Sequence, residues 1–153
     1  GAVQWNLLFI IYGMLGMGLA MEETGASLWL AESLTGTVIG LVVPSWQPYI
    51  MLACVYLLTN LLTESLSNNA AAVLMATLAI GIAESLGVSM RPFLFAVAIA
   101  ASSSFATPIG YQTNTYVYGA GGYRFSDFTK AGLPLNVLCF LISIFLIPLI
   151  WAF

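Results

Sequence analysis

Polar side chains that could bind ions gather in two short stretches of the sequence, each set between long apolar runs. Residues 63–69 read TESLSNN and residues 107–114 read TPIGYQTN. Hydroxyl and amide groups of this kind bind small ions. They do not suit nucleophilic catalysis, because the chain has no His and the Ser and Glu side chains of these stretches have no Lys nearby to act as a base. We therefore expect a binding protein and not an enzyme, with no metal site built from His.

Each polar stretch should lie between two helix ends of opposite polarity. The helix that starts after Asn69 and the half-helix that starts after Asn114 would point free backbone N–H groups and positive dipole ends at the break, where an anion could bind. Helices that end near Leu66 and Ala106 would leave unpaired carbonyl oxygens, which suit a cation such as sodium. One site could therefore hold ions of both signs without a cationic side chain.

Several of these residues also have a purely structural interpretation. Glu64 is the only acid deep inside a long apolar run, so it either lines the site or accepts hydrogen bonds from backbone N–H groups at the turn. The sequence Ser-Asn-Asn at 67–69 could be only a helix cap. Pro108 and Gly110 could make only a packing kink, but the amides at 112–114 are too many at one break for packing alone.

The composition requires a lipid environment. Of 153 residues, 61% are hydrophobic and 6% are charged, whereas a soluble domain carries about 25% charged residues. The three cations, Arg91, Arg124 and Lys130, are scattered, which excludes a nucleic-acid surface. Cys54 and Cys139 lie in apolar runs and predict no disulfide framework.

The apolar runs predict an all-α membrane protein, and the whole chain, 1–153, is interpreted as one transmembrane segment of a larger transporter. The predicted elements are a span at 5–21, an interfacial connector at 22–46, a re-entrant hairpin at 47–86, a broken helix at 92–122, a solvent loop at 122–130 and a last span at 132–152. The turn at 63–69 has no flanking Lys or Arg, which favours a hairpin tip at membrane depth beside protein or a cavity. Pro108 and Gly110 predict a discontinuous helix. Its first half is expected to run from Pro92 to Ala106.

The two polar motifs resemble those of the divalent anion/sodium symporter family, within the superfamily that also holds citrate and arsenite carriers. Ser67-Asn68-Asn69 is similar to a family Ser-Asn-Thr signature at a hairpin tip, with Asn69 in place of the Thr. The resemblance covers nearly the whole chain, and the two motifs at this separation also resemble those of sulfate and dicarboxylate permeases. It implies one half of an inverted repeat, whose first copy is missing from this sequence.

The resemblance also implies roles for individual residues. By analogy, sodium would be bound by Thr63, Asn68 and the carbonyl of Ala106. The residues expected to face the anion are Ser67, Asn68, Asn69, Thr107 and Pro108, with Glu64, Gly110 and Asn114 as further lining.

The implied function is sodium-coupled transport of a small divalent anion, sulfate or a dicarboxylate, across the plasma (inner) membrane by a multi-pass protein. The expected partners are the lipid bilayer, the anion, the missing N-terminal repeat and a second copy in a homodimer; sodium is the coupling ion and no other cofactor is expected. Two alternatives stay open. One is an ion or metalloid antiporter or exporter of the same superfamily, and the other is a membrane assembly subunit that transports nothing.

Overall fold

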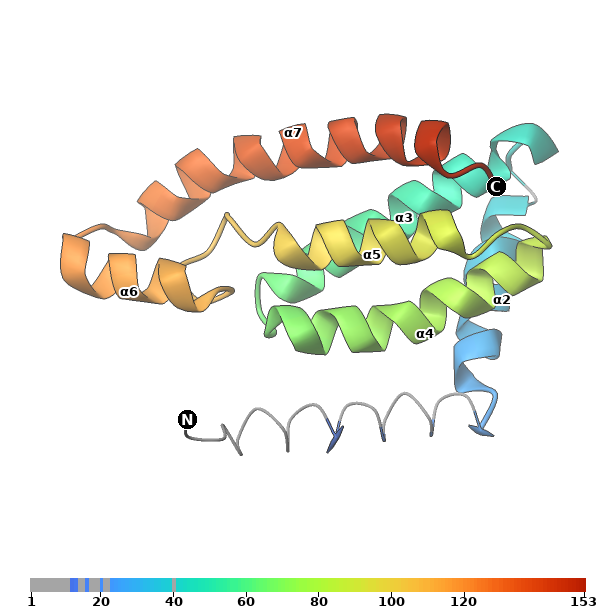
Figure 1. The fold of residues 1–153 in the computed structure, drawn as a ribbon, viewed down its shortest axis with the longest axis horizontal. Coiled ribbons are helices and arrows are strands. Elements are labelled where there is room, and N and C mark those ends of the chain that lie inside the picture. The colour runs from blue at the N-terminus through green and yellow to red at the C-terminus, as the bar shows by residue number, and fades with distance from the viewer. Residues whose placement is uncertain (1–11, 14–15, 17–19, 21–22, 40) are drawn as a thin grey trace.

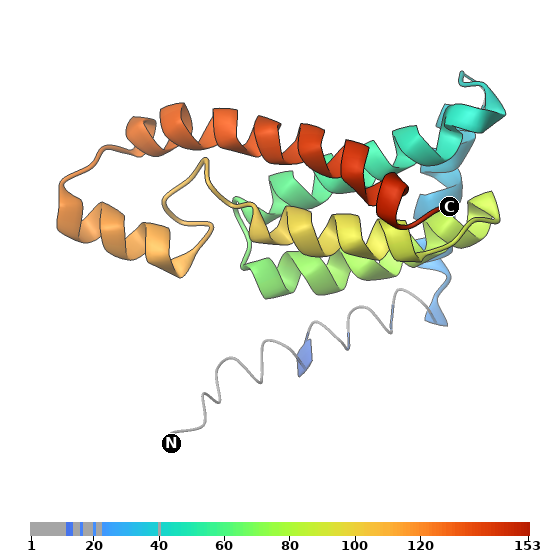
Figure 2. The same ribbon diagram turned by 45° about the horizontal axis from the view of Figure 1, so that its top comes forward.

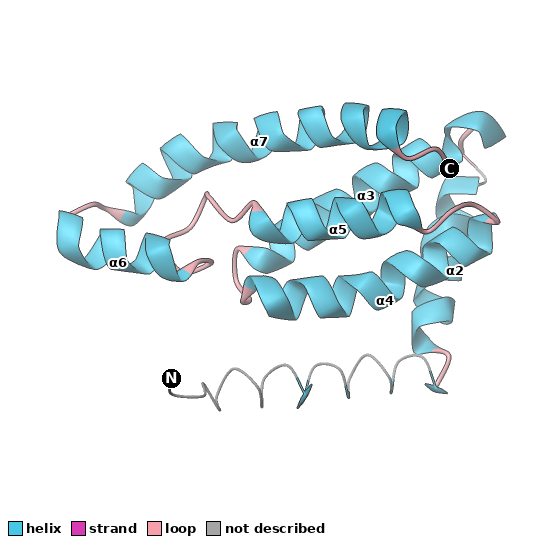
Figure 3. Cartoon of the chain, viewed as in Figure 1, coloured by secondary structure: helices cyan, strands magenta, loops and turns pink. Residues whose placement is uncertain are grey.

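The described residues form a bundle of helices. The computed structural model describes residues 12–13, 16, 20, 23–39 and 41–153, and these contain no β-strand (Figure 3). The helices are α2 (Ala26–Ile39), the short 3₁₀ helix η1 (Pro44–Trp46), α3 (Gln47–Thr63), α4 (Asn68–Leu86), α5 (Arg91–Ser102), α6 (Gln112–Gly121) and α7 (Phe125–Ile150). The predicted all-helical class is confirmed over this part of the chain.

Local sequence signals explain where the helices begin and end. Pro48 and Pro92 each lie in the first turn of a helix, where the missing N–H would have no helical partner in any case. Ser67 is the N-cap of α4, and its hydroxyl oxygen accepts a hydrogen bond from the Ala70 N–H at 3.3 Å. Gly87 ends α4 with φ of 66°, in the left-handed region that glycine adopts without strain.

Helices α3, α4 and α5 form the core, and the other elements pack around them. Figures 1 and 2 show α3 and α4 as a hairpin with α5 against both, α2 across one end, and α7 along α3 and α5. Helix α6 extends beyond the bundle, and none of its residues is buried. The fully buried side chains of the core include Leu52, Val55, Tyr56, Ala79, Ile82, Phe93 and Ala96.

Aromatic side chains mark one end of the bundle. The start of α3, the start of α5 and the C-terminal residues after α7 meet there, and Phe95 stacks on Trp151 with ring centroids 3.7 Å apart. Tyr49 contacts Phe153 edge to face at 5.0 Å. The turn at 64–67 and the break at 103–111 lie at the opposite end of the bundle. Trp and Tyr are enriched where membrane proteins meet the lipid–water interface.

Several predicted boundaries can be compared with the structure. The predicted span at 5–21 falls largely outside the described residues, and the predicted connector at 22–46 contains α2 and η1. Two described helices, α4 and α7, are long and apolar enough to cross a membrane. The membrane placement of the hairpin, the broken helix and the last span stays a prediction.

Two boundaries were wrong. The first half of the broken helix ends at Ser102, four residues before the predicted end at Ala106, because Ser103 caps α5 with non-helical backbone angles. The predicted solvent loop is helical from Phe125 onward. There the Asp127 carboxylate accepts a hydrogen bond from the Arg124 N–H at 2.8 Å, so the charges in this segment begin a helix.

Helix α7 approaches the break between α5 and α6 very closely at one glycine. A Cβ atom on Gly132 would overlap the Phe105 carbonyl group and lie 2.6 Å from the Ala106 nitrogen. Two residues later Pro134 removes one N–H from the helix ladder, which allows α7 to bend where it crosses the break. Gly132 is therefore a packing glycine.

Replacing Gly132 by Ala should destabilise the protein, because backbone and not a flexible side chain occupies the space of the new methyl group. We expect a loss of roughly 1–3 kcal/mol, typical of overpacking a close contact, seen as a lower thermal midpoint of the full-length protein. Gly119→Ala is the matched control, because nothing lies within 4 Å of its Cβ position. Equal midpoints for the two variants would contradict the close approach.

Candidate functional site

The turn between α3 and α4 and the break between α5 and α6 join at one polar corner. The Thr107 hydroxyl donates to the Glu64 carbonyl oxygen at 2.8 Å, and the Ser104 hydroxyl donates to the Thr63 carbonyl oxygen at 3.2 Å. Gly110 allows this approach, since a Cβ there would overlap Ser104 Oγ and lie 2.9 Å from the Thr63 oxygen. The two polar stretches, about 40 residues apart in sequence, therefore form one structural unit.

Two of the three predicted sodium ligands are in direct contact. The Thr63 hydroxyl lies 2.8 Å from Asn68 Oδ1 and 2.7 Å from the Ala101 carbonyl oxygen, and can donate its one proton to either. Ala106 lies on the break, and its carbonyl oxygen accepts a hydrogen bond from the Thr129 hydroxyl of α7 at 3.2 Å. Thr63 is fully buried, so its orientation is fixed by these partners.

The residues predicted to face the anion divide into two groups. Ser67 and Asn69 are exposed at the start of α4, and Ser67 makes the helix cap that was the structural alternative. No non-glycine residue of the described chain has a positive φ, so the two Asn residues of this turn are not in a left-handed conformation. Thr107 is half-buried and its hydroxyl also accepts from the Gly110 N–H at 3.2 Å, whereas Pro108 is buried.

Asn114 holds the break together from its own side. Its side-chain N–H group donates to the Ser104 carbonyl at 2.9 Å and to the Thr107 carbonyl at 3.1 Å. The neighbouring Thr115 hydroxyl donates to the Pro108 carbonyl at 2.8 Å. The amide donors of Asn114 therefore bind the backbone of the break, and only its side-chain oxygen is left to line a site.

Glu64 reaches from the hairpin turn to the break. Its Oε1 atom accepts hydrogen bonds from the Phe105 N–H at 3.1 Å, from the Ala106 N–H at 2.9 Å and from Asn136 Nδ2 at 2.7 Å. Its Oε2 atom lies 3.5 Å from Ser104 Oγ. The structural interpretation placed the N–H partners of this carboxylate in its own turn, but they belong to the break that follows α5.

The structure adds three polar residues to those that were predicted to form the site. Asn60 donates to the Ser103 carbonyl at 2.6 Å, Ser104 bonds the hairpin turn, and Asn136 bonds Glu64. A signal existed for two of them, because Asn60 and Asn136 are amides inside apolar runs of membrane length. Ser104 carries no comparable signal, since small residues are common in helices that pack closely.

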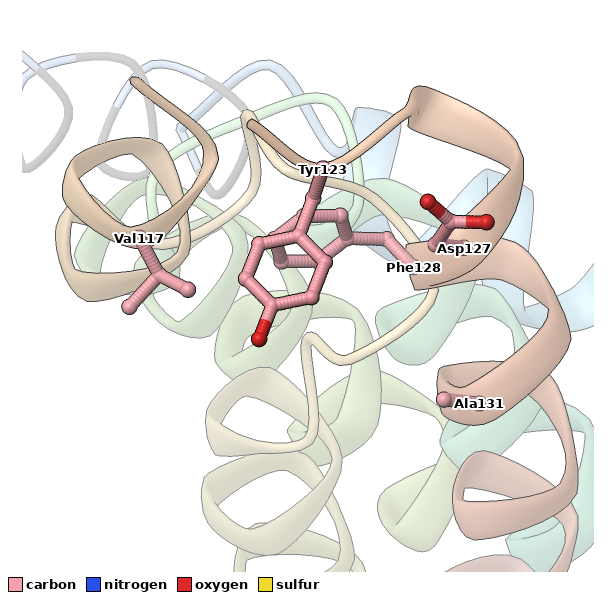
Figure 4. A pocket seen from close by; sticks show the side chains of 5 residues that line it. All are labelled: Val117, Tyr123, Asp127, Phe128 and Ala131. Atoms are coloured by element: carbon pink, nitrogen blue, oxygen red, sulfur yellow. The ribbon is translucent and has the colours of Figure 1, made fainter. Parts of the chain in front are cut away.

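A separate hollow lies between α6 and the start of α7. It encloses about 320 Å³ and is lined by Val117, Tyr123, Asp127, Phe128 and Ala131. Figure 4 shows the rings of Tyr123 and Phe128 close together in it, in an edge-to-face pair with centroids 6.1 Å apart. Its lining is apolar apart from one acid, and it shares no residue with the polar corner, so it does not suit an anion.

Comparison with known proteins gives a consistent set of relatives. Residues 1–100 match the model of the citrate transporter family. The chain is 46% identical over 155 residues to an uncharacterized transporter of Synechocystis and 35% identical over 152 residues to one of Escherichia coli, each alignment covering 99% of the chain and 24% of the relative. It is 30% identical over 146 residues to sodium/sulfate cotransporter 1 of Chlamydomonas reinhardtii, with 95% of the chain and 16% of that protein covered.

The chain therefore spans about a quarter of the length of the first two relatives. The family match ends at residue 100, before the break, α6 and α7.

Removing the Thr63 hydroxyl should cost stability even without bound ions. Thr63→Val keeps the shape of the side chain but leaves the Ala101 carbonyl without this donor, which we expect to cost roughly 1–3 kcal/mol. Thr63→Ser should restore most of the thermal midpoint. Thr77→Val is the control, because that hydroxyl bonds only its own helix, at Val73. A Thr63→Val protein as stable as wild type would show that the Thr63 contact to α5 is unimportant.

Proposed function

Because the chain belongs to the citrate transporter family, we propose that the full-length protein couples sodium movement to the transport of a small divalent anion, sulfate or a dicarboxylate. Family membership makes the chain part of an integral membrane transporter and not of an enzyme. The substrate, the coupling to sodium and the site residues are our inference. The similarity to a sodium/sulfate cotransporter of Chlamydomonas reinhardtii supports it.

The contact between Thr63 and Asn68 is the observation that carries the cation site. Two side-chain oxygens already lie 2.8 Å apart, and the Thr63 proton has a second acceptor at Ala101, 2.7 Å away. When the Thr63 proton turns to Ala101, neither oxygen is used by the other, and their separation of 2.8 Å is short enough for one cation to contact both. A hard cation such as sodium takes neutral oxygen ligands of this kind. The Ala106 carbonyl would complete the set from the break.

The anion would bind beside this cation at the start of α4. The first backbone N–H groups of a helix have no intrahelical partners, and the Ser67 hydroxyl satisfies one of those in α4. The Ala71 N–H bonds the Ser67 carbonyl, so the N–H groups of Asn68 and Asn69 themselves remain available, and the positive end of the helix dipole adds to them. The polar corner holds no Lys or Arg, so sodium would provide the main positive charge.

Helix lengths support a location at membrane depth. The aromatic end of the bundle is the candidate interface, and α5 starts there with Arg91. Its 12 residues reach about 18 Å at 1.5 Å each, which is short of a hydrocarbon core of about 30 Å. Both outer ends of the α3–α4 hairpin also lie at the aromatic end. A re-entrant hairpin that meets a discontinuous helix inside the bilayer fits these facts.

The chain would supply one half of the complete site. Ser67 and Asn69 are exposed, and α6 has no buried residue, so these surfaces need a partner to enclose a small anion. We propose that an inverted repeat elsewhere in the longer polypeptide closes the site, and that the transporter works as a homodimer in the plasma (inner) membrane.

Anion uptake should depend steeply on sodium. We expect the full-length protein in liposomes to accumulate labelled sulfate or succinate above empty vesicles when sodium is imposed outside. Uptake should fall to background in potassium buffer, because the polar corner has no Lys or Arg side chain that could balance the charge of the anion. Tight anion binding in sodium-free potassium buffer would contradict the coupling, and uptake driven by a proton gradient alone would favour the antiporter alternative.

Asn68→Ala should abolish sodium-dependent uptake while the protein still reaches the membrane. The Asn68 side chain is proposed to contact both sodium and the anion. Loss of a hydrogen bond to a charged group costs about 1.5–3 kcal/mol, or roughly 10-fold to 150-fold in affinity. Gln47→Ala is the matched control, because that amide bonds Val42 at the aromatic end. Wild-type uptake by Asn68→Ala would refute the assigned site.

A further inference from the structure

Helix α7 presents a stripe of three small or polar residues to the break. Thr129, Gly132 and Asn136 are spaced three and four residues apart, so they lie on one face of the helix. Thr129 bonds the Ala106 carbonyl, Gly132 packs on the Phe105 carbonyl group, and Asn136 bonds Glu64. Asn136 is 5% exposed, whereas Leu135 and Val137 beside it are 41% and 50% exposed. This face of α7 is therefore built to contact residues 105 and 106.

Glu64 holds the same two residues through their N–H groups. Phe105 and Ala106 follow the end of α5, so their N–H groups have no partner within a helix, and both point to a single carboxylate oxygen at 3.1 and 2.9 Å. Charge-assisted hydrogen bonds of this type are stronger than bonds between neutral groups. Both residues are thus fixed, with their N–H groups on Glu64 and their carbonyl groups against α7.

The hydrogen bond to Glu64 orients the Asn136 amide so that its side-chain oxygen is left without a partner. The Oδ1 atom of Asn136 is buried and has no hydrogen-bond partner in the described structure. Rotating the amide by half a turn would place this oxygen 2.7 Å from the carboxylate, where two acceptors would repel each other. An apolar residue would avoid the unpaired oxygen, so a role in folding alone does not explain this side chain.

We propose that Glu64 and Asn136 are positioning residues of the transport site, which fix the 105–106 peptide groups so that the Ala106 carbonyl and the Thr107 hydroxyl are presented to the bound ions. The proposal rests on the proposed function, in which Ala106 contributes a carbonyl ligand. Neither side chain needs to touch an ion. Glu64 connects the hairpin, the break and α7 through one oxygen, and Asn136 carries any displacement of α7 to that oxygen.

A positioning role and a charge role for Glu64 predict different effects of Glu64→Gln. The Gln carbonyl oxygen can accept from the same three donors, and its NH₂ group would face Ser104 Oγ, which can accept a hydrogen bond. The geometry of the break is therefore retained without the charge. Glu64→Ala removes every contact, and Asn136→Leu keeps the volume of the side chain while removing both the donor and the unpaired oxygen.

The experiment compares full-length wild type, E64Q, E64A and N136L by sodium-dependent uptake and by hydrogen–deuterium exchange in sodium-free detergent. We expect E64A to raise the sodium concentration for half-maximal uptake at least tenfold, and to speed exchange of residues 103–108 without changing exchange in the first half of α3. E64Q should need at least fivefold less sodium than E64A for half-maximal uptake.

N136L should raise the sodium requirement several-fold with little change in thermal midpoint. Loss of the hydrogen bond to Glu64 lowers stability, whereas loss of the unpaired Asn136 oxygen raises it. The control is E84A, an exposed acid near the other end of α4, which should match wild type.

Three outcomes would overturn the positioning role: loss of uptake in E64Q with unchanged exchange, a wild-type sodium requirement in E64A, or unchanged exchange of residues 103–108 in E64A. The exchange measurement needs no transport. If E64A speeds exchange at 103–108 but uptake by the wild-type protein shows no dependence on sodium, the proposed function fails. The role of Glu64 in fixing residues 105 and 106 would still stand.

Discussion

The need to satisfy every peptide group where a helix is interrupted governs this structure. Nine residues separate the end of α5 at Ser102 from the start of α6 at Gln112, and at the proposed depth in the membrane water would not be freely available to bond their N–H and C=O groups. The partners come from every neighbouring element: Glu64 and Asn60 from α3 and its turn, Asn114 and Thr115 from α6, and Thr129 from α7. The few polar side chains of an apolar chain therefore gather at one place.

The same groups can serve both structure and ion binding because several have more than one partner. The Thr63 hydroxyl has two acceptors within 2.8 Å and needs only one. The start of α4 offers N–H groups, and the same turn holds the Thr63 and Glu64 carbonyl oxygens that face the break, so opposite partial charges lie within one corner. A site of this type needs no ionic side chain other than the half-buried Glu64, whose carboxylate already accepts hydrogen bonds from two backbone N–H groups and an amide.

The sequence was enough to predict the helical class, the two polar stretches and the cap at Ser67, because these depend on local composition and spacing. It misplaced the end of α5, since Ser102 to Ala106 are compatible with a helix and only Pro108 marks the break. The partners of Glu64 could not be predicted, because they lie 41, 42 and 72 residues away and no local pattern states which helix faces which. Asn136 could have been predicted as a polar contact, because it is the only Asn or Gln in the last apolar run.

The distance in sequence between Glu64 and Asn136 has a consequence for biosynthesis. At about 5–20 residues per second, the 72 residues between them take roughly 4–14 s to synthesise. During that interval the hairpin and α5 can form in the translocon, but the carboxylate of Glu64 lacks its third donor and the break lacks the face of α7. The polar corner is therefore completed last, and a ribosome that stalls or terminates before α7 leaves a chain whose earlier helices are complete but whose polar corner is not.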